Sequence, residues 1–119
     1  MIAASALGEG TFVSSISGWY TGKDSRVWND GNRDATSTYV RFRGCTRTNG
    51  GATGAGVQVK RQRGFAPDEG KGTKTLYCGN VDTAYWGDLQ ASNYYFRLEK
   101  IAGRTSGEQL WVDSLRVAY

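Results

Sequence analysis

The sequence predicts an all-β fold, built as a single antiparallel β-sandwich domain of seven or eight short strands with one disulfide bond. Apolar and polar residues alternate in several short runs, which is the period-2 pattern of strands with one buried face. The chain has 119 residues, enough for one hydrophobic core, and its 17 glycines fall mostly in turn clusters between these runs. Amphipathic helical stripes of about 11 residues or more are absent from the sequence.

The alternating runs define the predicted strands. In the second run, Val40 and Phe42 fall on one face while Arg41 and Arg43 fall on the other. The clearest runs, in chain order, are Thr11–Tyr20, Thr38–Cys45, Gly56–Arg63, Thr73–Cys78, Tyr94–Ile101 and Leu110–Tyr119. Turn-forming residues separate them at 29–32, 49–56, 66–72 and 102–107. Residues 82–93 are the one segment with room for a helical turn.

The last run changes its phase part-way. Leu110 and Val112 share one face, whereas Leu115 and Val117 are one residue out of step with them. A slip of one residue moves side chains to the other face of a strand. We therefore predict a β-bulge or a switch between sheets around Asp113 and Ser114.

Cys45 and Cys78 are the two cysteines of the chain, and each lies near the end of a predicted strand. An even cysteine count in a small glycine-rich chain favours a disulfide bond and an oxidising compartment. We interpret residues 1–8 as a flexible N-terminal segment of a secreted, extracellular protein, with bacterial origin as the expectation. Apolar runs long enough for a membrane span are absent from the sequence, so we expect no membrane span.

The composition argues against an enzyme and against a metal centre. The chain contains no histidine, which excludes imidazole bases and histidine ligands, and two thiols cannot complete a four-thiolate zinc site. Asp30, Asn32 and Asp34 surround a glycine turn as calcium ligands would, but a later glutamate is missing and Arg33 interrupts the negative field. We therefore expect a plain turn there, no metal, no cofactor and no catalytic residues.

The aromatic residues suggest a binding function. Fifteen rings are more than a sandwich of this size is expected to bury, although a core role for all of them is the alternative. Trp28 and Trp86 each precede a polar turn, and pyranose rings stack their apolar face on such indoles. We predict that Trp28 and Trp86 stack a sugar while Asp30, Asn32 and Asp88 bind its hydroxyls.

The C-terminal stretch carries a family resemblance. It reads YYFRLEKI, a glycine-containing turn, then LWVDSLRVAY. The second strand has the order apolar-x-apolar-Asp-x-apolar-x-apolar at Leu110, Val112, Asp113, Leu115 and Val117. This pattern resembles the last two strands of jelly-roll carbohydrate-binding modules. The resemblance implies a jelly-roll form of the sandwich and a lectin-like, non-catalytic module whose partner is a carbohydrate or cell-surface polymer.

Positive charge is concentrated in the middle of the chain, where residues 35–67 hold six basic residues and no acidic one. If the two predicted strands there pair, they form a basic patch of Arg41, Arg43, Lys60, Arg61 and Arg63. Such a patch attracts polyanions, and its alternative is a solvated face that discourages edge pairing. Nucleic acid is disfavoured as the polyanion because the disulfide indicates an oxidising compartment.

A protein-interaction domain is the second interpretation. Gly64, Phe65, Ala66, Pro67 and Asp68 form a predicted loop inside the segment closed by the cysteines. Proline fixes the backbone of such a loop, and a rigid loop loses less entropy on binding. On this interpretation the protein is a toxin component, a protease inhibitor or a partner-binding subunit.

Overall fold

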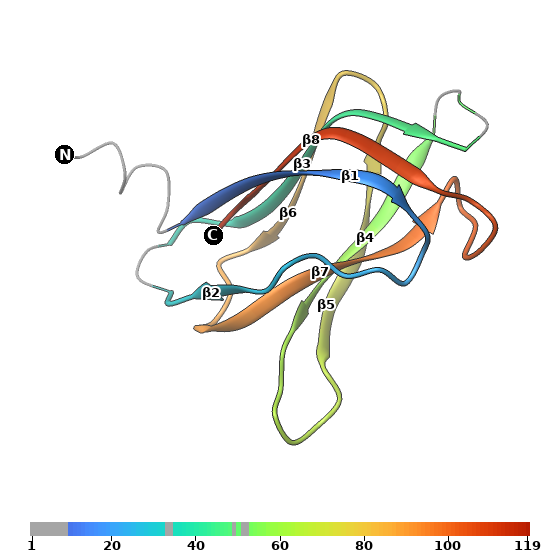
Figure 1. The fold of residues 1–119 in the computed structure, drawn as a ribbon. Coiled ribbons are helices and arrows are strands. Elements are labelled where there is room, and N and C mark those ends of the chain that lie inside the picture. Colours follow the sequence, from blue (N-terminus) through green and yellow to red (C-terminus); the bar gives the residue numbers. More distant parts are fainter. Residues whose placement is uncertain (1–9, 33–34, 49, 51–52) are drawn as a thin grey trace.

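The computed structural model describes residues 10–119 except 33, 34, 49, 51 and 52, and the segment predicted to be flexible, 1–8, lies outside them. The described chain contains eight strands and no helix (Figure 1), which confirms the all-β prediction. Accordingly, no helix in the described ranges has the length and apolar character needed to cross a bilayer. The strands are β1 (Thr11–Trp19), β2 (Trp28–Asp30), β3 (Thr38–Arg47), β4 (Gly54–Arg61), β5 (Glu69–Tyr77), β6 (Val81–Gly87), β7 (Ser92–Ile101) and β8 (Leu110–Ala118).

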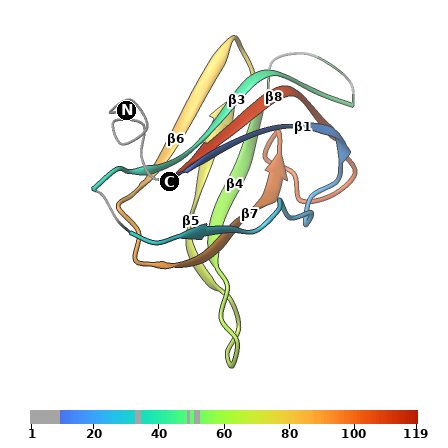
Figure 2. The same ribbon diagram turned by 60° about the vertical axis from the view of Figure 1, so that its left-hand side comes forward.

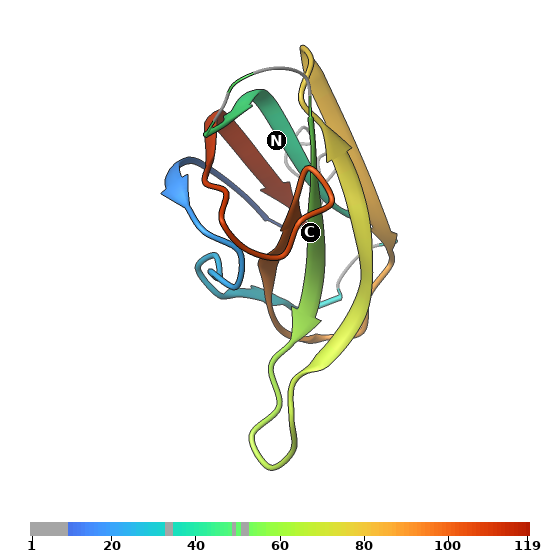
Figure 3. The same ribbon diagram turned by 90° about the vertical axis from the view of Figure 1, so that its right-hand side faces the viewer.

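The strands form two antiparallel sheets of four strands each. Sheet A has the order β1-β8-β3-β6, and sheet B has the order β2-β7-β4-β5. Consecutive strands change sheet at every connection except the β4–β5 hairpin, which projects beyond the rest of the molecule (Figure 2). This order is that of a jelly roll, in which two Greek keys wrap into a double sheet. Figure 3 shows the two layers from the side.

The core lies between the two sheets and is built by the residues that alternate inward. Val40 and Phe42 of β3 are buried against Phe96 and Leu98 of β7, and each of the four is at most 1% exposed. Each such side chain stabilises the fold by about 1.5–3 kcal/mol through burial. The side chains that alternate outward on the same strands lie on the two outer faces of the sandwich.

The predicted irregularity in the last strand is confirmed. Relative to β1, the β8 register shifts between Leu115 and Val112, which places the bulge at Asp113 and Ser114. Strand β3 changes phase at the same level and stays in register with β8, and Gly44 lies opposite Asp113 with a left-handed φ of 69°. A Cβ on Gly44 would lie 2.5 Å from the Asp113 carboxylate, so only glycine fits.

Strand β6 corrects the prediction for residues 82–93. The segment begins with a strand because Ala84 and Trp86 alternate inward while Tyr85 faces solvent. Thr38 to Arg43 of β3 pair with this strand and fix its register. The helical turn was a wrong expectation, since a short strand beside polar turns has too few apolar positions to show its period.

The predicted disulfide is confirmed between Cys45 and Cys78, whose Cα atoms lie 4.9 Å apart. Cys45 lies on β3 of sheet A, and Cys78 directly follows β5 of sheet B. The bond therefore ties the two sheets together at one end of the sandwich.

Candidate functional site

Trp28 does not form the predicted sugar platform, because its side chain is 1% exposed. Its ring stacks on Tyr94 and Tyr119 at centroid distances of 6.3 and 5.9 Å, and Phe12 lies 5.9 Å away. Strand β2 is a short edge strand of sheet B, and its inward residue Trp28 fills the space between the sheets at this edge. The structure thus corrects the prediction for Trp28, which has a packing role.

Trp86 is also part of the core, at 9% exposure. Its indole Nε1 donates a hydrogen bond of 2.8 Å to the carbonyl oxygen of Gly72 on β5. Because β5 and β6 are the edge strands of opposite sheets, the ring closes the gap between them. The prediction that Trp86 stacks a ligand is therefore wrong as well.

The polar residues predicted to accompany these rings lie at one end of the sandwich. Asp30 is buried and accepts a hydrogen bond of 2.8 Å from the backbone N–H of Asn32, which fixes the turn. Thr38 lies 3.5 Å from the other Asp30 oxygen, and the neighbouring Ser37 hydroxyl accepts the N–H of Gly87. The carboxylate therefore organises the turn from inside. The exposed residue Asp88 follows Gly87 in the adjacent loop.

A calcium site at this turn receives no support. Asp34, one of its three possible ligands, lies outside the described residues. Elsewhere in the described chain, no three histidine, cysteine, aspartate or glutamate residues gather as metal ligands would.

The predicted basic patch is divided between the two sheets. Arg41 and Arg43 lie on β3 of sheet A, whereas Lys60 and Arg61 lie on β4 of sheet B. Arg63 follows β4 in the projecting hairpin. The assumption that β3 and β4 pair was wrong, because the jelly-roll connection between them crosses from one sheet to the other.

A groove on the outer face of sheet B combines an exposed aromatic ring with exposed polar side chains, which makes it a candidate site. It has a volume of about 430 Å³, and we call it the Tyr77 groove. Tyr77 forms one wall and is 67% exposed, while Gly54 and Gly56 of β4 leave the floor without side chains. The groove is lined by Gly54, Gly56, Thr73, Thr75, Tyr77, Lys100, Ala102 and Gly103.

Strand pairing explains how the groove arises. Gly54 pairs with Tyr77 and Gly56 pairs with Thr75, so the side chains of β5 stand beside a strip of bare backbone. Gly56 also pairs with Lys100 of β7 on its other side. The flanking strands are two strand spacings apart, about 10 Å, which sets the width of the groove.

Three restraints hold Tyr77 in place. The neighbouring Cys78 is disulfide-bonded to Cys45, and its N–H donates a 2.7 Å hydrogen bond to the carbonyl oxygen of Thr53. The N–H of Tyr77 donates a 2.8 Å hydrogen bond to the carboxylate of Asp82. The backbone that carries the exposed ring is therefore restrained, which reduces the backbone entropy that is lost when a ligand binds.

Polar groups accompany the ring. Neither the Thr73 nor the Thr75 hydroxyl bonds to another described residue, and the same holds for the Lys100 ammonium. A second hollow of about 430 Å³ adjoins Tyr77 on the side of Thr53 and Cys78. The Thr53 hydroxyl beside it is buried, so the exposed polar groups are those of Thr73, Thr75 and Lys100. Such groups suit a ligand that carries many hydroxyls.

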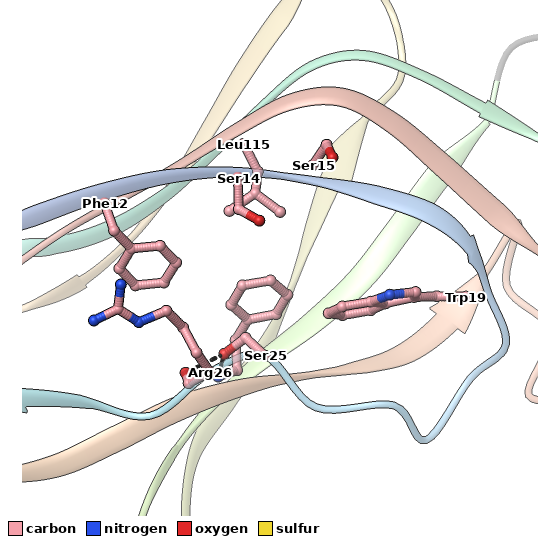
Figure 4. Close-up of a pocket in the computed structure, with 8 residues that line it drawn as sticks. Phe12, Ser14, Ser15, Trp19, Ser25, Arg26 and Leu115 are labelled. Atoms are coloured by element: carbon pink, nitrogen blue, oxygen red, sulfur yellow. Dashed lines mark hydrogen bonds between the residues drawn. The ribbon is translucent and has the colours of Figure 1, made fainter.

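Figure 4 shows a different hollow, which opens between the sheets under β1. It has a volume of about 130 Å³, and Phe12, Trp19, Phe96 and Leu115 supply its apolar walls. The Arg26 guanidinium stacks on the Phe12 ring at 4.4 Å. A cavity of this size holds about one six-membered ring, so it is too small for a polymer chain.

The fold and the groove define a jelly-roll β-sandwich with a shallow aromatic-walled groove on one outer face. Comparison of the chain with protein-family models, curated proteins and solved structures finds no match.

Proposed function

We propose that the protein is a non-catalytic carbohydrate-binding module that holds a neutral glycan chain in the Tyr77 groove. The observation that carries the proposal is an exposed tyrosine on a restrained backbone beside a glycine floor. This site replaces the one predicted at Trp28 and Trp86. The disulfide supports an oxidising environment, and we place the protein outside the cell, where polysaccharides are met.

The chemistry of the groove fits a pyranose. The apolar C–H face of the sugar stacks on the Tyr77 ring, which supplies a large contact area on a side chain with few rotamers. The Thr73 and Thr75 hydroxyls donate to and accept from sugar hydroxyls, and the Lys100 ammonium donates to them. The bare backbone at Gly54 and Gly56 lets the chain approach the sheet closely.

Affinity electrophoresis in gels that contain xylan, a mannan or a mixed-linkage glucan tests the proposal. We expect at least one neutral polysaccharide to retard the wild type and Y77A to lose that retardation. Y20A is the matched control, because Tyr20 is exposed to a similar degree, 57%, but lies outside the groove. T75V is expected to weaken binding with the ring intact. Absence of retardation on the panel, or equal losses for Y77A and Y20A, contradicts the proposal.

A partner-binding role is supported by a separate observation. Phe65 is 107% exposed in the connection between β4 and β5, the hairpin that projects from the sandwich (Figure 2). Asp68 stiffens the connection by accepting the N–H of Arg63 at 3.1 Å and the hydroxyl proton of Tyr95. An exposed apolar ring on a projecting hairpin can insert into an apolar pocket of another protein.

Pull-down from culture medium with wild type and F65A tests this second role. The expected result is a protein that wild type retains, that neutral polysaccharides do not displace and that F65A loses. If F65A retains that protein at the wild-type level, Phe65 is not the contact.

A further inference from the structure

The outer face of sheet A carries three arginines in the middle of the sheet. Arg41 and Arg43 lie on β3, and Arg116 lies on β8, which together are the two central strands of this sheet. Arg41 and Arg116 are directly paired across the strands. We call these three residues the arginine face. Arg116 was absent from the patch predicted from the sequence, because it is far from the others along the chain.

This arrangement is electrostatically unfavourable by itself. Like charges directly opposite each other on paired strands repel and destabilise the sheet. Among the described residues, no carboxylate forms an ion pair with any of the three guanidinium groups. Asp113 is nearby, and its carboxylate covers Gly44. Charges that block edge-to-edge pairing belong on edge strands, and β3 and β8 are not edges, so that explanation fails.

Arg41 is held in a defined orientation. Its Nε donates a 3.0 Å hydrogen bond to the Thr83 hydroxyl of β6, and its guanidinium stacks on the Tyr39 ring at 4.8 Å. Tyr39 is in turn braced by Tyr85, edge to face, at 5.7 Å. The two terminal nitrogens of Arg41 remain for an acceptor, in the fork geometry that binds carboxylate and sulfate groups.

The three arginines surround a shallow hollow rather than a flat surface. Its volume is about 480 Å³, and Val13 and Ser114 complete the lining. Val13 is 60% exposed and lies beside Arg116 on the neighbouring strand. The hollow thus combines three cationic donors with one apolar contact and one hydroxyl.

We infer that the arginine face binds an acidic polysaccharide whose carboxylate or sulfate groups accept hydrogen bonds from Arg41, Arg43 and Arg116. Val13 and Ser114 would contact the sugar backbone between those groups. The inference is independent of the proposed function, because the Tyr77 groove lies on the opposite outer face. A nucleic acid is the less favoured polyanion, because the disulfide indicates an oxidising compartment.

Isothermal titration with dextran sulfate, and with unmodified dextran as the uncharged counterpart, tests the inference. Wild type is expected to bind dextran sulfate and to bind it less tightly as NaCl is raised, and R116Q is expected to leave any binding of dextran unchanged. R116Q is expected to lose about tenfold in affinity, the size of one charge-assisted hydrogen bond. R116Q keeps or raises the thermal midpoint, because it relieves the repulsion with Arg41, so misfolding would be visible in that measurement.

R63Q is the matched control, because it removes the same charge from the exposed hairpin of the other sheet. We expect R63Q to bind dextran sulfate as wild type does, and Y77A to do so as well. Equal losses in R63Q and R116Q would show attraction by net charge only and would overturn the site. Tighter binding of a single-stranded oligonucleotide than of dextran sulfate at equal salt, lost in R116Q, would overturn the choice of polysaccharide.

Discussion

Reduction of the Cys45–Cys78 bond is expected to remove a large share of the stability and to loosen the Tyr77 groove. The bond closes a loop with a sequence separation of 33 residues. In the chain-entropy model, a loop of this length contributes about 3.7 kcal/mol by restricting the unfolded chain. A domain of this size is stable by about 5–15 kcal/mol in total, so the loss is substantial.

Urea unfolding of the oxidised and the reduced protein, followed by tryptophan fluorescence, measures this contribution. We expect the free energy of unfolding to fall by about 3–4 kcal/mol on reduction, and the urea dependence to steepen because the unfolded chain is less compact. The glycan that wild type binds should also be bound more weakly by the reduced protein, since Cys78 anchors Tyr77. A change below about 1 kcal/mol would refute the reasoning that the bond stabilises the fold by restricting the unfolded chain.

Three further predictions follow from the packing and the turns. Ala102 has a left-handed φ of 53° in the two-residue turn before Arg104, so A102N, which suits that conformation, should raise the free energy of unfolding by about 1 kcal/mol in urea titrations. W28A should destabilise the fold by about 3–5 kcal/mol, whereas W28F should cost less because the indole N–H has no hydrogen-bond partner among the described residues; equal costs would contradict this account. The hydroxyl of Tyr95 and the N–H of Arg63 lower the pKa of Asp68. The Asp68 carboxylate therefore stabilises the folded state above about pH 3.9, and this stabilisation is lost as the pH falls through the lowered pKa. Burial and the hydrogen bond to Asp68 raise the pKa of Tyr95 to about 12. The neutral Tyr95 hydroxyl therefore stabilises the folded state fully below about pH 10, and this stabilisation is lost as the pH rises towards 12. The protection factor of the Arg63 amide against hydrogen exchange should therefore fall in acid in wild type, and it should already be low at neutral pH in D68N.

Local patterns predicted most of the strands. The alternation at residues 38–45 and 94–101 reflects strands with one buried face, and β3 and β7 occur there. The phase slip at Asp113 and Ser114 marked a real bulge for the same reason. Strand β2 was missed because three residues cannot display a period, and its ends lie among turn-forming residues.

The candidate site depended on how strands are distributed between sheets, which alternation does not encode. Arg41 and Arg61 belong to strands that follow each other along the chain, yet the jelly-roll crossing places them in different sheets. Trp28 and Trp86 lie beside polar turns, and only the closure of the sandwich at its end and edge shows that both rings are buried.

The sequence contains a signal of the Tyr77 groove that did not enter the prediction of the site. In the predicted strand 73–78, an inward Leu76 requires Thr75 and Tyr77 to face outward. Gly54 and Gly56 likewise alternate with the apolar Ala55 and Val57. What the sequence could not reveal is that these two strands are neighbours, in a register that puts Tyr77 beside Gly54.

Chemical-shift mapping of the ¹⁵N-labelled protein, titrated with an oligosaccharide fragment of the retained neutral polysaccharide, tests glycan binding by the groove most directly. We expect saturable shifts of the backbone amides of Gly54, Gly56, Thr75 and Tyr77, with the amides around Arg41 and Arg116 unmoved. Shifts clustered at any other surface, with Gly54 and Tyr77 unchanged, would contradict the assignment of the groove as the binding site.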